Sequence, residues 1–259
     1  MKLQDVIKRY NPFLVYMENK FLIVSCFYNA APFIERCVGS IACQDYQNYR
    51  VLFVDDASTD NGFDLIDDDE RFIKIKNQEN KGLLYNYATY LPMYANEDDI
   101  IVVVDGDDAL HGNKSISYLN DFYNQNACMA TYGQSVWTDG RKGFARPYTE
   151  QEFNNLRKTQ FIASHLRTFK YQCFKEIYNQ DPQLDCFKDK NGEYLKAAPD
   201  VAIMFPVMEI AGFERVKYID KILHLYNFHN PLSEHNVHQQ LQWDCHSIVS
   251  SKKPFKICF

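Results

Sequence analysis

Residues 100–108 read IIVVVDGDD, and this stretch decides the fold class. An unbroken apolar run predicts a strand buried on both faces, and the acidic residues that follow mark its end. The pattern recurs at residues 50–56, which read RVLFVDD, and a related apolar run occupies residues 21–27. Strands of this kind belong to parallel sheets that helices cover on both faces.

The segments around these runs alternate between helix and strand patterns. Predicted helices cover residues 32–42, 61–67, 83–94 and 115–126, and further predicted strands cover residues 72–75 and 127–132. This alternation predicts an α/β fold, with a mostly parallel central sheet flanked by helices. Ligands of such sheets bind at the carboxyl ends of the strands, so functional residues are expected there.

The second half of the chain is less regular. Predictions here are a turn at residues 140–143, helices over 150–160 and 199–211, a polar loop over 181–192, and a hairpin of strands 216–219 and 222–226. Pro206 is expected to kink its helix, because proline removes a backbone hydrogen bond. We make no prediction for the tail from residue 233.

Composition limits the class of protein. With 259 residues, 46% of them hydrophobic, the chain can bury a sizeable core, and a single domain over residues 1–259 is expected. The 28 basic and 34 acidic side chains give a net charge of −6, which argues against a general nucleic-acid-binding surface. No apolar stretch approaches the roughly 18 residues of a membrane-spanning helix. Eight cysteines without metal-type spacing predict reduced thiols in the cytoplasm.

Two acidic clusters directly follow buried strands. Asp55 and Asp56 form the first, and Asp105, Asp107 and Asp108 form the second. Carboxylates crowded at a sheet edge repel one another unless a cation joins them, and Asp-x-Asp offers the oxygen ligands that Mg²⁺ and Mn²⁺ prefer. Solvated turns or helix N-caps are the alternative explanation for each cluster. Two such clusters at the same edge of the sheet favour a divalent cation, which the protein would share with the phosphates of a substrate.

Several segments resemble, in order and spacing, the N-terminal motifs of family 2 glycosyltransferases, which have the GT-A fold. They are residues 24–29, 37–41, 44–46, 54–60, 80–82 and 104–108. The resemblance implies a nucleoside-diphosphate sugar donor, a divalent metal (Mn²⁺ or Mg²⁺), and sugar transfer with inversion at the anomeric carbon. It makes residues 20–135 the nucleotide-sugar-binding half and about 136–259 the acceptor-side half.

The resemblance also implies which residues bind the nucleotide. Asp56 would hold the base, next to Asp55, and the backbone around Phe27 and Asn29 would line the same pocket.

The second acidic cluster and the helix before it complete the implied donor site. Asp105 would contact the ribose beside Gly106, and Asp107 would ligate the metal that bridges the diphosphate. Many relatives carry an Arg-Asn pair in the helix after residue 82. This chain lacks the arginine, which leaves Lys81 or Asn86 as substitutes for a phosphate contact.

A late segment, residues 226–233, resembles the family's Tyr-Arg-x-His-x-x-Ser motif, whose histidine approaches the metal or diphosphate. His229 takes that position, and Asn227 replaces the arginine. A neutral imidazole suits Mn²⁺, while an ordinary surface histidine is the alternative. A zinc site is a further alternative, from His235, His238 and Cys245.

Transfer to a hydroxyl needs a general base, because the attacking oxygen becomes more acidic as it reacts. Asp200 matches the second residue of the family's Glu-Asp motif, with Pro199 in place of the glutamate, although a helix N-cap would also explain it. Glu209 is the weaker candidate, since nine residues turn an ideal helix by about 900° and aim it at the opposite face. Arg167, with His165 nearby, could bind a diphosphate or an anionic acceptor, or form a structural salt bridge.

The expected function is therefore metal-dependent, inverting transfer from a UDP-sugar to a hydroxyl of a glycan or glycoconjugate, without an integral membrane segment. Two alternatives stay open. One is a phage- or virus-type enzyme that glycosylates hydroxymethylated bases of DNA in the host cytoplasm. The other is a non-catalytic nucleotide-sugar-binding protein on the same fold.

Overall fold

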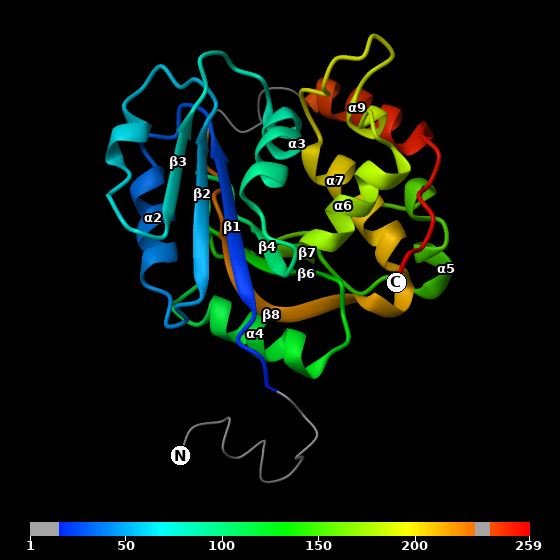
Figure 1. Cartoon of the computed structure of the whole chain (residues 1–259), viewed down its shortest axis with the longest axis horizontal. Helices are drawn as coiled ribbons and strands as arrows, with labels where there is room; N and C mark the ends of the chain where they lie inside the picture. The colour runs from blue at the N-terminus through cyan, green and yellow to red at the C-terminus, as the bar shows by residue number, and fades with distance from the viewer. Residues whose placement is uncertain (1–15, 231–238) are drawn as a thin grey trace.

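The computed structural model describes residues 16–230 and 239–259. Within these ranges the strands form one eight-stranded sheet in the order β3-β2-β1-β4-β7-β6-β8-β5 (Figure 1). The strands are β1 (Lys20–Phe27), β2 (Tyr49–Asp55), β3 (Phe72–Lys76), β4 (Asp99–Val103), β5 (Ala109–Leu110), β6 (Ala130–Trp137), β7 (Arg167–Lys170) and β8 (Val216–Tyr226). The α-helices are α2 (Ile34–Ala42), α3 (Leu83–Tyr94), α4 (Ser115–Gln125), α5 (Glu150–Phe153), α6 (Tyr171–Gln180), α7 (Pro199–Ala211) and α9 (Gln239–Ser251).

The first half of the chain builds the parallel part of the sheet. Strand β1 pairs in parallel with β2 and β4, and β2 pairs in parallel with β3. The carboxyl ends of β1, β2 and β4 therefore meet at one edge. Strand β7 runs antiparallel to both β4 and β6, and β8 runs parallel to β6. The predicted α/β sheet is confirmed, with antiparallel pairing where the second half joins it.

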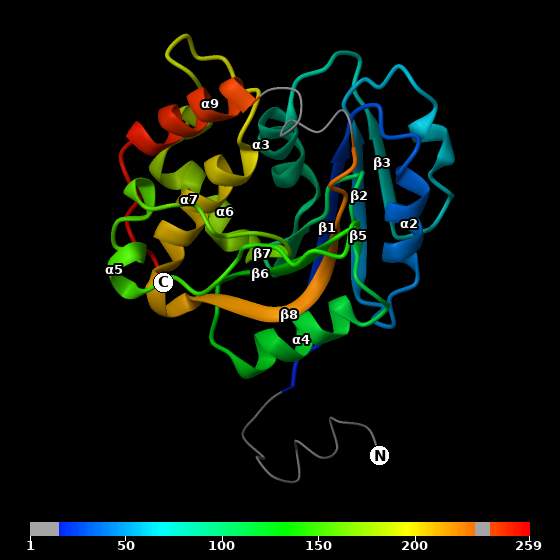
Figure 2. The same ribbon diagram turned by 180° about the vertical axis from the view of Figure 1, so that it is seen from behind.

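Side-chain alternation along β1 explains why both faces of the sheet are covered. Leu22 and Val24 belong to a core with α3, α6 and α7, whereas Phe21 and Ile23 belong to a core with α2 and α4. Successive strand residues point to opposite faces, so a strand that is apolar throughout needs helices on each side. Figures 1 and 2 show α2 and α3 on opposite sides of β1 and β2.

The predicted hairpin at residues 216–226 is wrong. These residues form the single strand β8, and Gly133 of β6 pairs with Ile219 while Gln134 pairs with Ile222. The polar pair Asp220 and Lys221 is thus extra on one strand, which is a β-bulge and not a turn. A bulge and a turn interrupt an apolar pattern in the same way, so the sequence could not distinguish them.

Other boundaries differ more modestly from the predictions. The helix expected over residues 150–160 divides into α5 and the 3₁₀ segment Leu156–Lys158, and the one expected over 61–67 is the 3₁₀ segment Gly62–Leu65. Helix α7 continues on both sides of Pro206. No helix in the described part of the chain is long and apolar enough to span a membrane.

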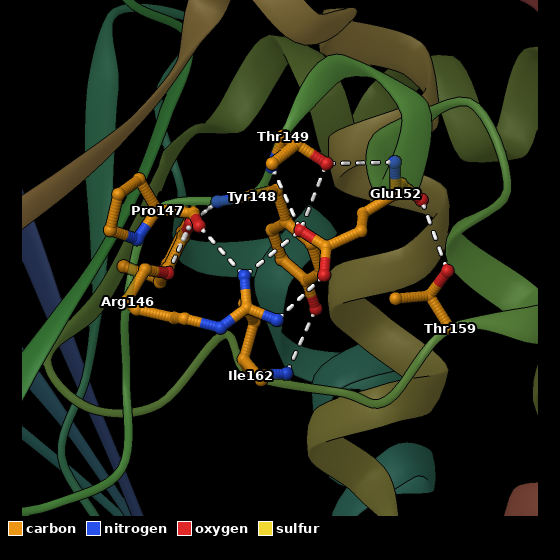
Figure 3. Close-up of polar contacts among 8 residues, drawn as sticks. Arg146, Pro147, Tyr148, Thr149, Glu152, Thr159 and Ile162 are labelled. Carbon is orange, nitrogen blue, oxygen red and sulfur yellow. Dashed lines mark hydrogen bonds and ion pairs between the residues drawn. The ribbon is translucent and has the colours of Figure 1, made fainter.

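A hydrogen-bond network fixes the loop before α5 (Figure 3). Thr149 Oγ1 accepts from Glu152 N at 3.2 Å, and Glu152 Oε2 accepts from Thr149 N at 2.9 Å, which completes a capping box. Arg146 donates to both carboxylate oxygens of Glu152, at 2.9 and 2.6 Å. Tyr148 Oη accepts from Ile162 N at 2.9 Å, so the network extends to the segment that leads into β7.

Thr149→Ala is expected to lower the free energy of unfolding by about 1 kcal/mol, because α5 loses the side-chain oxygen that caps it. Thr149→Ser keeps this oxygen and is the matched control. Urea denaturation followed by circular dichroism measures the difference. Equal unfolding free energies for the alanine and serine variants would contradict a capping role.

Candidate active site

The site begins at the edge where β1, β2 and β4 end. Phe27, the last residue of β1, lies in register with Asp55 of β2, and its carbonyl accepts from Asp56 N at 2.8 Å. On the other side of β1, Gly106 N donates to the Cys26 carbonyl at 3.3 Å. The two acidic clusters therefore flank the end of one strand, as the sequence predicted for a parallel sheet.

Asp56 joins the strand edge to the loop before α3. Its Oδ1 accepts from Asn77 Nδ2 at 2.7 Å and from Lys81 N at 3.0 Å, and its Oδ2 accepts from Gly82 N at 2.7 Å. A carboxylate offers about four acceptor positions, so about one stays available to a ligand. The side chain is buried, and its negative charge holds three donors of this loop in place.

The two substitutes for the missing arginine lie in different places. Asn86 is buried, and its Oδ1 accepts from Asn77 Nδ2 at 2.8 Å, so it belongs to the network around Asp56. Its Nδ2 has no hydrogen-bond partner among the described residues. The ammonium of Lys81 instead pairs with Glu79 at 2.6 Å. Of these two side chains, that of Asn86 is the one that the fold joins to the network around Asp56.

Asn29 and Asp55 organise the loops after β1 and β2. Asn29 N donates to Ser58 Oγ at 2.9 Å, and Asn29 Oδ1 accepts from Thr59 N at 2.8 Å. Asp55 Oδ1 accepts from Ser58 N at 2.8 Å, and its Oδ2 lies 3.6 Å from Lys76 Nζ. These bonds hold the two loops against each other. Asp55 is fully buried, so it supports these loops from inside.

The turn after β4 presents the second acidic cluster. A Cβ on Gly106 would lie 2.5 Å from Phe27 Cβ, which is closer than side chains approach, so glycine is required there. Asp107 Oδ2 accepts from Asn230 Nδ2 at 2.6 Å, and the Asp107 carbonyl accepts from Arg36 Nη2 at 2.7 Å. The turn is therefore packed against β1 and held by groups from α2 and from the segment after β8.

The carboxylates of this turn carry more negative charge than their surroundings balance. Burial, together with the charge of Asp108, raises the pKa of Asp107 to about 6. Burial and the same neighbour also raise the pKa of Asp105. A divalent cation would relieve both effects, and carboxylate oxygens are suitable ligands for Mg²⁺ or Mn²⁺.

His224, which the sequence left without a role, contacts the second acidic cluster from β8. Its ring is fully buried, and Nε2 lies 2.8 Å from Asp108 Oδ2. Asp108 Oδ1 accepts from Asn227 N at 2.7 Å, so one carboxylate joins β8 and the following segment to the turn after β4. The only signal in the sequence was a histidine inside an apolar strand run, where a buried partner is required.

Among the described residues, Asp108, His165 and His224 form a cluster that could in principle hold a metal ion. Each offers one possible ligand atom, and these atoms all lie within 4.8 Å of one another. The two rings are stacked, with centroids 4.5 Å apart, and burial lowers the pKa of both. Arg167 Nη2 lies 3.0 and 2.9 Å from the two ring nitrogens of His165. A cation bound to His165 would meet this guanidinium charge. Hydrogen bonding therefore explains the cluster better than a metal does.

A small pocket of about 30 Å³ opens beside this cluster, and Asp105, Arg167 and Asp200 all line it. Its other walls are Leu83, Tyr87, Val103, Pro199, Ile203 and Met204. The pocket thus joins the end of β4, the start of β7 and the start of α7. Arg167 Nη1 lies 3.3 Å from Asp200 Oδ2 across it.

The remaining candidates lie away from this pocket. Glu209, at the other end of α7, forms a buried ion pair with Arg157, with Nε to Oε1 at 2.6 Å. His229 is exposed, and its ring contacts Phe228, with centroids 5.6 Å apart. The neighbouring Asn230, and not His229, contacts Asp107. His235 and His238 of the alternative zinc site lie outside the described residues.

A larger cavity of about 510 Å³ lies elsewhere, against the end of α6 and residues 252–256. None of the carboxylates described above lines it. Asp105, Arg167 and Asp200 line the smaller pocket, so that pocket, and not the larger cavity, is the candidate active site.

Comparison with known proteins agrees with this fold. Glycosyl transferase family 2 matches residues 22–178, so the chain belongs to this family. Glycosyltransferase GlyG of Streptococcus pneumoniae is 33% identical over 101 residues, which cover 38% of this chain and 33% of GlyG. The chain thus spans about a third of the length of this relative.

Solved structures share the GT-A fold that the sequence predicted. S. aureus TarS 1-349 in complex with UDP-GlcNAc has a TM-score of 0.63 and 18% identity, over 85% of this chain and 61% of that one. The mannosyltransferase PcManGT of Pyrobaculum calidifontis, in complex with GDP-Man and Mn²⁺, has a TM-score of 0.56 and 17% identity, over 80% of this chain and 56% of that one.

Proposed function

We propose that the protein transfers a sugar from a UDP-sugar to a hydroxyl group of a glycan or glycoconjugate, with inversion at the anomeric carbon. The observation that carries this proposal is the pocket shared by Asp105 and Asp200. It unites a carboxylate of the nucleotide-binding edge with the candidate base, although the two residues are far apart in the sequence. Membership of glycosyl transferase family 2 supports the reaction class.

The donor half of the site suits a nucleoside diphosphate. Asp56 retains an acceptor position for the N–H of a base, with Phe27 and Asn29 at the same edge and Asp55 beneath it. Asp105 with Gly106 would face the ribose, and Asn86 offers an unpartnered amide N–H. TarS was solved with UDP-GlcNAc and PcManGT with GDP-Man, which supports a donor of this type.

Mn²⁺ or Mg²⁺ fits the donor set at Asp107, where burial and neighbouring carboxylates hold excess negative charge. When bound, the cation would neutralise the leaving diphosphate. His229 is the proposed further ligand, from the segment that Asn230 holds against Asp107. The Mn²⁺ in the PcManGT complex supports this choice of metal.

Asp200 is the proposed general base. The acceptor oxygen forms a bond to the anomeric carbon as the bond from that carbon to the diphosphate oxygen breaks, and the hydroxyl proton moves to Asp200. Asp200 is 38% exposed, so an acceptor can reach it, while Glu209 is occupied by Arg157. Holding both substrates at one site converts their encounter into an in-line displacement.

Two further parts of the proposal concern the whole chain. A single domain over residues 1–259 is supported by the sheet that strands of both halves share in residues 16–230. A cytoplasmic location is supported by Cys43 and Cys258, which are exposed and form no disulfide.

Isothermal titration calorimetry with a panel of nucleotide sugars, with and without Mn²⁺, tests the donor assignment. We expect a UDP-sugar to bind most tightly and Mn²⁺ to strengthen its binding. Donor consumption with added glycans then tests transfer. Tight, metal-independent binding without any transfer would instead indicate a non-catalytic binding protein.

Asp56→Ala is expected to weaken UDP binding about 10- to 100-fold even without metal, because a charge-assisted hydrogen bond contributes about 1.5–3 kcal/mol. The melting temperature should also fall, since three donors of the loop lose their acceptor. Asp67→Ala removes an exposed carboxylate from the same region and is the control. Calorimetry on both variants measures the effect. Equal affinity in Asp56→Ala and wild type would remove Asp56 from the nucleotide site.

A further inference from the structure

We infer that Arg167 is a positioning residue that orients the carboxylate of Asp200 toward the acceptor. This inference rests on the proposed function, because it requires Asp200 to be the base. The sequence left Arg167 with three roles: a diphosphate contact, an acceptor contact or a structural salt bridge. Its contacts in the fold favour a role that acts through Asp200.

The guanidinium meets Asp200 from a fixed point of the sheet. Arg167 is the first residue of β7 and lies in register with Val103 at the end of β4. Its side chain is 6% exposed, and Nη1 lies 3.3 Å from Asp200 Oδ2. Asp200 forms no other ion pair with the described residues. A carboxylate at the start of a helix is thereby tied to the rigid centre of the sheet.

The other side of the guanidinium is also held. Arg167 Nη2 lies within 3.0 Å of both ring nitrogens of His165, and burial keeps this ring neutral by lowering its pKa. A neutral ring can accept a hydrogen bond from arginine. The His165 ring stacks on His224, which itself contacts Asp108. Arg167 is thus braced by the same cluster that fixes the turn after β4.

A diphosphate contact is the competing role. Arg167 Nε has no hydrogen-bond partner among the described residues, so one N–H is available to a ligand. However, the charge of Arg167 is already shared between Asp200 and Asp105, which lines the same pocket. The two roles can be separated by replacing Arg167. If Arg167 contacts the diphosphate, its replacement changes donor affinity. If it positions Asp200, its replacement changes turnover, and only while Asp200 is present.

The test compares Arg167→Gln, Asp200→Asn and the double variant in donor Kd, acceptor KM and kcat. Arg167→Gln is expected to lower kcat roughly 10²-fold, the loss typical of a misplaced catalytic group, with donor Kd within about twofold of wild type. In the Asp200→Asn background the same change should cost no further kcat. Arg167→Lys, which keeps the charge but not the planar geometry, should restore part of the rate.

Arg157→Lys is the matched control, because it also alters a buried arginine that pairs with a carboxylate of α7, but at Glu209. It should lower the melting temperature and leave kcat unchanged. If Arg167→Gln does not fold, the comparison of the two lysine variants decides: a kcat loss confined to Arg167→Lys supports the inference, and equal kcat values overturn it.

Two results would overturn the positioning role alone. The first is a donor Kd that Arg167→Gln raises at least tenfold in both the wild-type and the Asp200→Asn background. The second is an equal loss of kcat on Arg167→Gln in both backgrounds, while Asp200→Asn itself remains nearly inactive. Wild-type turnover in Asp200→Asn, or no transfer by the wild-type protein, would overturn the proposed base or function together with this inference.

Discussion

Asp200→Asn is expected to lower turnover roughly 10²–10⁴-fold, the contribution typical of a positioned general base. The structure corrects the N-cap alternative for Asp200, because Ala198 is the N-cap of α7 and the helix has no side-chain cap. Donor Kd and the melting temperature should stay near wild type, because asparagine fits the same space and no cap is lost. Asp200 lines the pocket with Asp105 and is open to an acceptor. Measurements of rate, donor Kd and melting temperature on one preparation separate a catalytic role of Asp200 from a structural one.

Glu209→Gln is the control for this prediction. Glu209 lies on the same helix, but its buried carboxylate pairs with Arg157 and accepts from Phe255 N at 3.0 Å. Its loss should reduce stability without changing turnover, since breaking a buried pair leaves an uncompensated charge. Wild-type turnover in Asp200→Asn together with a large loss in Glu209→Gln would move the base to Glu209.

Asp107→Asn is expected to abolish the increase in donor affinity that Mn²⁺ produces, an effect on the order of several kcal/mol when a metal neutralises a diphosphate. The protein should stay folded, because burial and neighbouring charge already disfavour the ionised carboxylate there. Calorimetric titration of donor with and without Mn²⁺ measures this difference.

Asp98→Asn removes an exposed carboxylate that pairs with Lys20 away from the site, and it should leave the metal effect intact. Unchanged Mn²⁺ stimulation in Asp107→Asn would show that the cation is held by other groups. The metal assignment would then have to be abandoned, while the nucleotide assignment to Asp56 would still stand on its own variant.

The elements with strong local patterns were predictable from the sequence. The helices expected over residues 83–94 and 199–211 have those bounds in the structure, and the strand ends that carry Asp56 and Asp105 lie at one edge. Apolar runs and helical spacing are local features, so they can be recognised without knowing the partners. The general place of the site followed from them.

Features that depend on distant partners were not predictable. The polar pair Asp220 and Lys221 resembles a turn until β6 is known to pair on both sides of it. His224 has no local signal of its contact with Asp108, which comes from the other half of the chain. Pairing register and buried polar contacts are set by tertiary packing, and one sequence does not reveal them.

The same distinction applies within the candidate site. The sequence offered Lys81 and Asn86 as equal substitutes for a missing arginine, but the fold directs Lys81 to Glu79 and Asn86 toward Asp56. The contact between Arg167 and Asp200 was likewise hidden, because a salt bridge between separate elements leaves no spacing pattern. Residue types could be predicted, whereas their pairing required the structure.

Anomalous diffraction at the manganese edge, from crystals grown with UDP and Mn²⁺, tests the central claim most directly. We expect one manganese peak at the Asp107 carboxylate, next to the diphosphate. The nucleobase of UDP should lie near Asp56, and Asp200 should face the side of the pocket that the nucleotide leaves open. A peak among Asp108, His165 and His224, or UDP bound in the cavity at residues 252–256, would contradict it.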